Sequence, residues 1–155
     1  MFFKKSVKNM DSEGNGLAQI LTSQGNDALP NSEFFRDKTM DMSIDSLKDV
    51  ASYLDTLADI ELSDQDKMRV IYRAGGYLGE VIKQESKRDL HWYKCKNVPA
   101  VDKFCNNVGS VLVLSDDRNS NAMLPFAKIA QIVIHKEKED LVFYAKAFLA
   151  LEEQK

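Results

Sequence analysis

The longest regular pattern of hydrophobic and polar positions lies in residues 63–85. Its apolar positions recur at alternating spacings of three and four, which places them on one face of an α-helix. These positions are Met68, Ile71, Gly75, Leu78 and Ile82. Ser63 is a favourable N-cap, and Asp64 and Asp66 put negative charge at the positive end of the helix dipole. The pattern therefore predicts a capped helix over residues 64–85.

Three glycines, Gly75, Gly76 and Gly79, lie inside this predicted helix. Each costs roughly 0.8–1 kcal/mol relative to alanine in a helix interior, so we expect an offsetting gain. Close approach of a neighbouring backbone supplies one, because glycine has no Cβ. A turn at Gly75-Gly76 is the alternative, but the apolar periodicity keeps its phase across the glycines and favours a continuous helix. Glycines this far inside a helix do not form a phosphate-binding loop.

A second amphipathic pattern covers residues 44–60, with Ser43 as its cap. Its apolar face holds Ile44, Leu47, Val50, Ala51, Leu54, Leu57 and Ala58, and its polar face holds Asp45, Asp49, Ser52, Thr56 and Asp59. The short link to residue 64 predicts an antiparallel helical hairpin. We expect the apolar face of the first helix to pack on the glycines of the second.

Three short runs downstream, residues 90–95, 111–114 and 122–124, have the apolar and aromatic content of β-strands. They predict a small antiparallel sheet of about three strands, with residues 111–114 in the centre. Pro125 suits the first position of a helix that continues to about residue 135. A last helix is predicted over residues 138–153.

Together these elements predict an α+β fold, with an N-terminal helical hairpin, the sheet and two C-terminal helices. Residues 1–32 are rich in Gly, Ser, Asn and Asp and predict a flexible N-terminal arm. Such an arm docks on its own domain, or engages a partner or a second subunit. Residues 33–155 are expected to form a single domain, as the length of the chain suggests.

The segment Arg-Ala-Gly-Gly-Tyr-Leu-Gly-Glu-Val-Ile at residues 73–82, followed by Trp92, resembles small bacterial domains of uncharacterised function. In those domains a helix of this kind precedes a tryptophan, a short sheet and a closing helix. Leu124-Pro125 and Phe143-Tyr144 stand where the later parts would lie, so the resemblance covers residues 63–151. It implies this architecture and a bacterial source, and it implies no activity.

Composition narrows the setting of the protein. No run of the 155 residues approaches the 18 apolar residues of a membrane span, and the basic start of the chain is not followed by the apolar core of a secretory signal. We therefore expect a cytoplasmic protein with no membrane association. Cys95 and Cys105 are accordingly expected to be reduced thiols.

The charge is distributed unevenly along the chain. Residues 43–66 carry seven acidic groups and one basic group, a net −6, although the whole chain carries only −3. Such a block covers a solvated face, or it steers a basic partner. The second interpretation predicts a non-enzymatic module that binds another protein, for example an immunity-type inhibitor of a cytoplasm-acting bacterial toxin. The expected partner-binding residues are Asp45, Asp49, Tyr53, Asp55 and Asp59, with Tyr53 or a loop residue as the anchor.

The alternative is an enzyme or small-ligand-binding domain with a pocket between the sheet and the helix at residues 64–85. That pocket would be lined by Arg73, Tyr77, Glu80 and Trp92. A homodimer that uses the N-terminal arm is a third possibility.

No catalytic motif is present in the sequence, and no catalytic residue is assigned. The cysteines and histidines lack the spacing of a zinc site, and residues 116–121 lack the pattern of a calcium loop, so no metal or cofactor is expected. Residues 83–96 combine basic and aromatic side chains, but the chain is acidic overall and nucleic acid is an unlikely partner.

Overall fold

The computed structural model describes residues 8–99, 101, 112–116 and 122–152. Its α-helices are α1 (Asp11–Gln19), α2 (Leu47–Thr56), α3 (Asp64–Glu85), α5 (Pro125–Val133) and α6 (Leu141–Glu152). Its strands are β1 (His91–Lys94), β2 (Leu112–Ser115) and β3 (Ala122–Met123), and its 3-10 helices are η1 (Gly25–Asp27), η2 (Ser32–Asp37) and η3 (Cys95–Asn97). The predicted α+β class is confirmed, as are the two C-terminal helices.

The three strands form one antiparallel sheet in the order β1-β2-β3, so the central position predicted for residues 111–114 is confirmed. Leu114 of β2 pairs with Trp92 on one side and with Met123 on the other. β2 is buried at Val113, Leu114 and Ser115. The strands are short, and the sheet depends on the helices packed against it.

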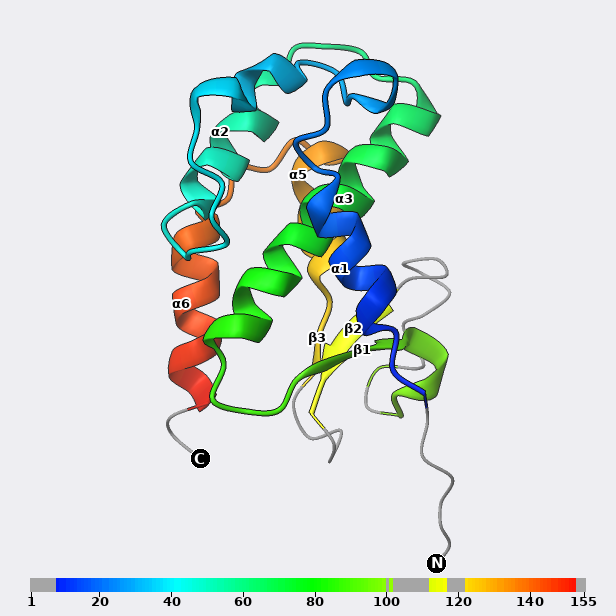
Figure 1. The fold of residues 1–155 in the computed structure, drawn as a ribbon, viewed down its shortest axis with the longest axis vertical. Helices are drawn as coiled ribbons and strands as arrows, with labels where there is room; N and C mark the ends of the chain where they lie inside the picture. Colours follow the sequence, from blue (N-terminus) through cyan, green and yellow to red (C-terminus); the bar gives the residue numbers. More distant parts are fainter. Residues whose placement is uncertain (1–7, 100, 102–111, 117–121, 153–155) are drawn as a thin grey trace, which may run out of the picture.

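α3 occupies the middle of the molecule, with α1 and α5 packed on it (Figure 1). Ser63 caps it as predicted, because its Oγ accepts a hydrogen bond from the amide of Asp66 at 3.1 Å. Every residue from Val70 to Ile82 is buried except Tyr72. The remaining elements are arranged around this helix.

α3 runs without a break through its three glycines, and neighbouring elements approach the helix closely at each of them. A Cβ on Gly76 would lie 2.9 Å from the Leu17 Cβ and 3.1 Å from the Ala18 amide nitrogen, both in α1. A Cβ on Gly75 would overlap the Phe126 ring of α5, and one on Gly79 would overlap the Trp92 indole. The prediction that the glycines allow close packing is confirmed, although two of the three admit aromatic rings as well as, or instead of, backbone.

The N-terminal segment differs from its prediction. In residues 8–32 the chain forms α1 and η1 and packs against α3 and β1, and the Met10 amide donates to the Trp92 carbonyl at 2.7 Å. Leu21 and Leu29 are buried in the core. A flexible arm is therefore wrong for this part of the chain, while residues 1–7 lie outside the described residues. Composition misled here because glycine serves close packing in α1 too.

The packing of α2 also differs from its prediction. Its buried side chains include Leu47, Val50 and Leu54, and its main contacts are with α6 and η2. The glycine positions of α3 are instead occupied by α1, Phe126 and Trp92. α2 and α6 lie on the left side of Figure 1, away from α1.

Two further observations concern the setting of the chain. None of the helices in the described residues combines the length and the apolar content needed to cross a bilayer. Cys95 is disulfide-bonded, so the expectation of a reduced thiol is wrong for it; Cys105 lies outside the described residues. Disulfides are rarer in the cytosol than in oxidising compartments but occur in both, so this bond does not by itself assign the protein to a compartment.

Candidate functional site

The predicted acidic residues lie on the solvent side of α2 and of the turns that flank it. Asp45, Asp55 and Asp59 are exposed and Asp49 is half-buried. Lys48 contacts Asp45 at 3.1 Å, and both side chains are largely in water. The apolar side of the helix faces the core, so the 3.6-residue period leaves these carboxylates on the outer face.

Tyr53 does not belong to this surface. Its side chain is fully buried, and its hydroxyl donates a hydrogen bond of 2.6 Å to the Pro30 carbonyl. Its ring packs against Phe35, and burial raises the pKa of the phenol. Tyr53 therefore fastens the segment around Pro30 to α2, and its predicted role as an exposed anchor is wrong.

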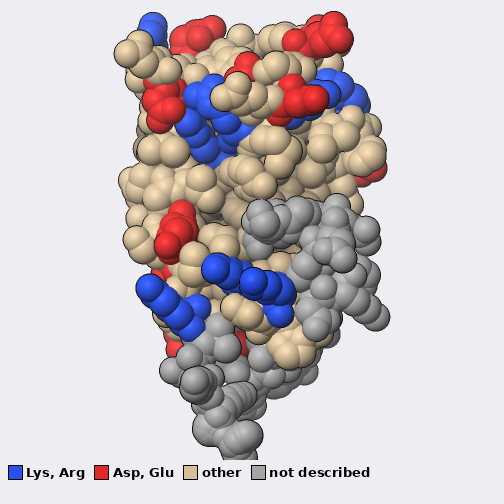
Figure 2. All heavy atoms as spheres, turned by 90° about the vertical axis from the view of Figure 1, so that its right-hand side faces the viewer, with Lys and Arg blue, Asp and Glu red and all other residues tan. Residues whose placement is uncertain are grey.

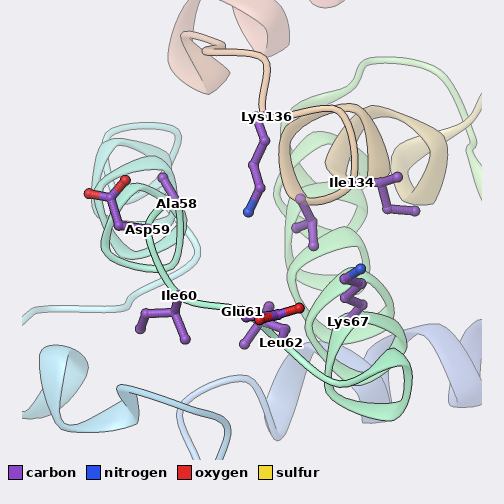
Figure 3. A pocket seen from close by; sticks show the side chains of 9 residues that line it. Ala58, Asp59, Ile60, Glu61, Leu62, Lys67, Ile134 and Lys136 are labelled. Carbon is purple, nitrogen blue, oxygen red and sulfur yellow. The ribbon is translucent and has the colours of Figure 1, made fainter.

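An open groove lies at the C-terminal end of this acidic face. Its volume is about 330 Å³, and it is formed by the α2–α3 link, the start of α3 and the end of α5 (Figure 3). Leu62 and Val133 are buried beneath it, while Ile60 and Ile134 at its edges are 38% and 47% exposed. The sequence pattern did not single out these two isoleucines, which give the groove an apolar edge on which a partner side chain can pack.

Charged side chains share the groove. Lys136 and Lys67 extend into it from opposite sides, and Glu61 lies at its base between them (Figure 3). The Asp59 carboxylate points away, toward the outer side of α2. Lys67 lies 4.0 Å from the exposed Asp64 carboxylate, at the limit of an ion pair. Within the described part of the chain, Lys136 has no carboxylate partner.

The backbone at Lys136 is unusual. Its φ is +58°, in the left-handed region that glycine and asparagine adopt more readily than lysine. The Glu137 amide, one residue later, donates to the Gln131 carbonyl at 3.2 Å and closes the end of α5. This ending directs the lysine side chain back over the groove.

The residues of the predicted alternative pocket are all buried, and each is engaged by contacts within the described part of the protein. Arg73, Tyr77, Glu80 and Trp92 are 6%, 2%, 3% and 0% exposed. The Tyr77 hydroxyl lies 2.7 Å from the Ser46 hydroxyl and accepts from the Met42 amide. The structure thus assigns these side chains to the interior.

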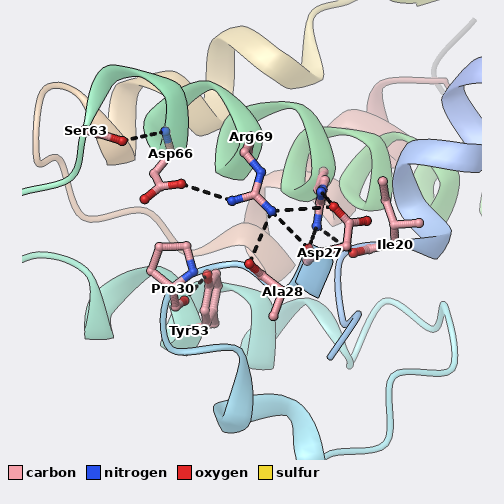
Figure 4. A network of polar contacts seen from close by, with 9 residues as sticks. Ile20, Asp27, Ala28, Pro30, Tyr53, Ser63, Asp66 and Arg69 are labelled. Atoms are coloured by element: carbon pink, nitrogen blue, oxygen red, sulfur yellow. Dashed lines mark hydrogen bonds and ion pairs between the residues drawn. The ribbon is translucent and has the colours of Figure 1, made fainter. Parts of the chain in front are cut away.

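Arg73 and Arg69 of α3 hold the segment at residues 20–28. The Arg73 guanidinium donates at 2.7 Å to both the carbonyl and the carboxylate of Asp27, and more weakly to the Ile20 carbonyl. Arg69 donates to the carbonyls of Asp27 and Ala28 (Figure 4). These contacts pair backbone carbonyls of the segment with the two guanidinium groups and so hold it against α3.

Glu80 and Trp92 form a buried hydrogen bond between α3 and β1. The indole Nε1 donates to Glu80 at 2.7 Å, and the amide of Asn15 in α1 donates to the other carboxylate oxygen at 3.1 Å. Lys83 lies 3.7 Å from the same carboxylate. Glu80 therefore joins α1, α3 and β1 through one side chain, and its role is structural.

His91 links β1 to α1 beside this contact. Its Nδ1 lies 2.6 Å from Asp11, its Nε2 lies 3.0 Å from Asp89, and Asp11 also accepts from the Trp92 amide. The hydrogen bond with Asp11 and the charge of both carboxylates raise the pKa of His91, although partial burial opposes this. Burial alone would raise the pKa of Asp11, but its bonds with His91 and Trp92 and the charge of Lys83 outweigh it, so that pKa is lowered.

These shifts predict a pH-dependent stability. Because the folded pKa of His91 is raised, its contribution is complete below the unfolded value of about 6.5 and is lost as the pH rises through the folded pKa. We expect urea unfolding to show lower stability at pH 8.5 than at pH 6. His91→Gln should reduce this difference, whereas His135→Gln at an exposed position should leave it unchanged. Equal pH dependence in the two variants would contradict this assignment.

The face of the molecule opposite α2 carries positively and negatively charged side chains intermixed. In Figure 2, which shows the right-hand side of Figure 1, basic and acidic side chains lie next to one another in the upper part. No group of three or more His, Cys, Asp and Glu side chains in the described residues is arranged to hold a metal ion. The acidic face of α2 and the groove beside it are therefore the candidate site.

Comparisons with protein-family models, with curated proteins and with solved structures find no match to this chain.

Proposed function

We propose that this protein works by binding another protein through the exposed acidic face of α2. The observation that supports the proposal most is the excess of carboxylates on this face, where Asp45, Asp49, Asp55 and Asp59 accompany one lysine, Lys48. A partner with a basic surface would be steered to it, because complementary charge accelerates association.

The carboxylates of this face are largely unused within the protein. The side chains of Asp55 and Asp59 make no hydrogen bond or ion pair with any other described residue, and the Asp45–Lys48 pair is exposed. Exposed pairs of this kind contribute only about 0–1 kcal/mol to stability. The face therefore retains its negative potential toward solvent, where a partner would meet it.

An immunity-type inhibitor of a cytoplasm-acting bacterial toxin is the specific role that we propose. Such an inhibitor covers a basic active-site groove, and an acidic helix face is suited to that task. The likeness of residues 73–82 to small bacterial domains supports a bacterial source. If the proposal is correct, the product of a neighbouring gene is the toxin, and the purified pair forms a complex.

Charge reversal on α2 tests this proposal. The double variant Asp45→Lys, Asp49→Lys is expected to weaken binding of the neighbouring gene product by at least about tenfold, measured by calorimetry, because two attractive charges become repulsive. Adding salt should weaken wild-type binding as well. The matched control is Glu13→Lys, Glu85→Lys, which makes the same charge change at exposed positions outside α2 and the groove.

The control should unfold close to the wild-type urea concentration, because both of its positions are exposed. The α2 variant should be destabilised by no more than about 1–2 kcal/mol, since Asp49 is half-buried and lies in the first turn of α2, where a negative charge is favourable. Equal binding by the α2 variant and the control would contradict the proposed surface. Absence of any complex with the neighbouring gene product would contradict the inhibitor role.

A further inference from the structure

We propose that the groove between the α2–α3 link and α5 receives a segment of the partner that carries an apolar side chain next to a carboxylate. This inference rests on the proposed function and specifies which chemistry the partner presents. The apolar side chain would lie over Leu62 and Val133, between the exposed edges formed by Ile60 and Ile134.

The size and shape of the groove suit one inserted side chain. A volume of about 330 Å³ lies at the lower end of the range of about 300–1,000 Å³ for sites that enclose whole small molecules. The groove is open to solvent, so a side chain can enter while its backbone stays outside. In most protein interfaces a few side chains that fill desolvated pockets carry a large share of the binding energy.

The charged side chains of the groove favour a carboxylate next to the partner's apolar side chain. Two ammonium groups, of Lys67 and Lys136, face the hollow, and only one carboxylate, of Glu61, lies between them. Lys136 has no carboxylate partner among the described residues, and the contact of Lys67 with Asp64 is long, at 4.0 Å. An incoming carboxylate would therefore complete an ion pair that the protein leaves open.

The position of Lys136 supports the same conclusion. Glycine or asparagine would satisfy its left-handed backbone with less strain, yet the residue present is a lysine whose amino group reaches the groove. Asparagine at this position keeps the backbone conformation and removes the charge. Lys136→Asn is therefore a variant that loses the proposed contact without endangering the fold.

The acidic face fixes the direction of the bound segment. Asp59, the last carboxylate of this face in the sequence, lies at the side of the groove that is farther from Lys67 (Figure 3). A segment whose carboxylate meets the lysines would then place its basic residues over α2. The expected order along the partner segment is basic residues, apolar anchor and carboxylate.

Two synthetic peptides test this order. The first is acetyl-Lys-Lys-Gly-Leu-Leu-Glu-amide, and the second has glutamine in place of glutamate. We expect the first peptide to bind about 1.4- to fivefold more tightly in an NMR titration, since an exposed ion pair is worth about 0.2–1 kcal/mol. The amide shifts should change at Ile60 and Ile134.

Variants of the groove sharpen the test. Lys136→Asn should remove the preference for the glutamate peptide, and Glu61→Gln should increase it, because the competing carboxylate is gone. Ile134→Ser should weaken both peptides. Equal binding of the two peptides by the wild type, an unchanged preference in Lys136→Asn, or no shift at the groove would overturn the proposal.

Failure of this inference can be told apart from failure of the proposed function. If Asp45→Lys, Asp49→Lys abolishes binding of the neighbouring gene product while Ile134→Ser and Lys136→Asn leave it unchanged, the α2 surface stands and the groove proposal is wrong. If the groove variants weaken that binding as well, both the α2 surface and the groove take part in partner binding.

Discussion

Glu80→Ala is expected to lower the free energy of unfolding by about 3–5 kcal/mol, the usual cost of removing one member of a buried charged contact. The substitution leaves the Trp92 indole N–H without its acceptor at 2.7 Å, and it removes the acceptor of the Asn15 amide. It also leaves an empty volume beneath α1. Urea unfolding followed by tryptophan fluorescence measures the loss directly, because Trp92 is the single tryptophan of the chain.

Two variants control this experiment. Glu80→Gln keeps the volume and one oxygen acceptor, so its cost should be smaller, about 1–2 kcal/mol. Glu85→Ala makes the same truncation at an exposed position of the same helix and should change stability by less than about 0.5 kcal/mol. A loss in Glu80→Ala no greater than that in Glu85→Ala would show that Glu80 does not join the three elements.

Gly14→Ala is expected to destabilise the protein by about 1–3 kcal/mol, because the added Cβ overlaps the buried Trp92 indole. The ring has little room to move away. Gly79 lies against its other end, and the Phe126 ring is stacked on it with ring centroids 5.5 Å apart. The overlap therefore has to be relieved by a shift of α1 itself.

Gly16→Ala is the matched control on the same helix. A Cβ at Gly16 would have no other atom within 4 Å, so only the gain in helix propensity remains, about 0.5–1 kcal/mol of stabilisation. The two alanines, two residues apart, should thus shift the urea midpoint in opposite directions. A stabilising Gly14→Ala would mean that α1 does not pack on the tryptophan.

The parts of the fold that the sequence predicted are those fixed by local signals. The cap at Ser63, the phase of the apolar positions and the proline at residue 125 each define an element end or face, and α3 was predicted with its observed bounds. The β-strands shifted by one residue at most at each end. In these segments local preference and tertiary packing agree.

Long-range packing was harder to predict. α1 has Gly14, Asn15 and Gly16 at its centre, a composition typical of a loop, and its helix is stabilised by contacts with α3 and β1. A usable signal was present, because Gly14, Ala18 and Leu21 recur at helical spacing and all three are buried. As in α3, the missing Cβ of Gly14 allows a neighbouring element to pack closely against the helix.

The candidate site was predicted only in part. The acidic positions of α2 follow from periodicity, and they are at the surface. Tyr53 was misplaced because a tyrosine at the edge of a helix face can point toward the core or toward solvent. Here its hydroxyl points inward and donates to the Pro30 carbonyl. The groove joins residues near 60 with residues near 135, a proximity that no local pattern encodes.

The attachment of α1 to β1 has a consequence for biosynthesis. The contacts of Asp11 with His91 and Trp92 join residues 80 and 81 positions apart, and Asn15 contacts Glu80 across 65 positions. At about 5–20 residues per second, translation delivers these partners roughly 4–16 s after the first helix has left the ribosome. During that interval α1 lacks its contacts with β1, and a ribosome that pauses before residue 92 would leave it accessible to holdase chaperones.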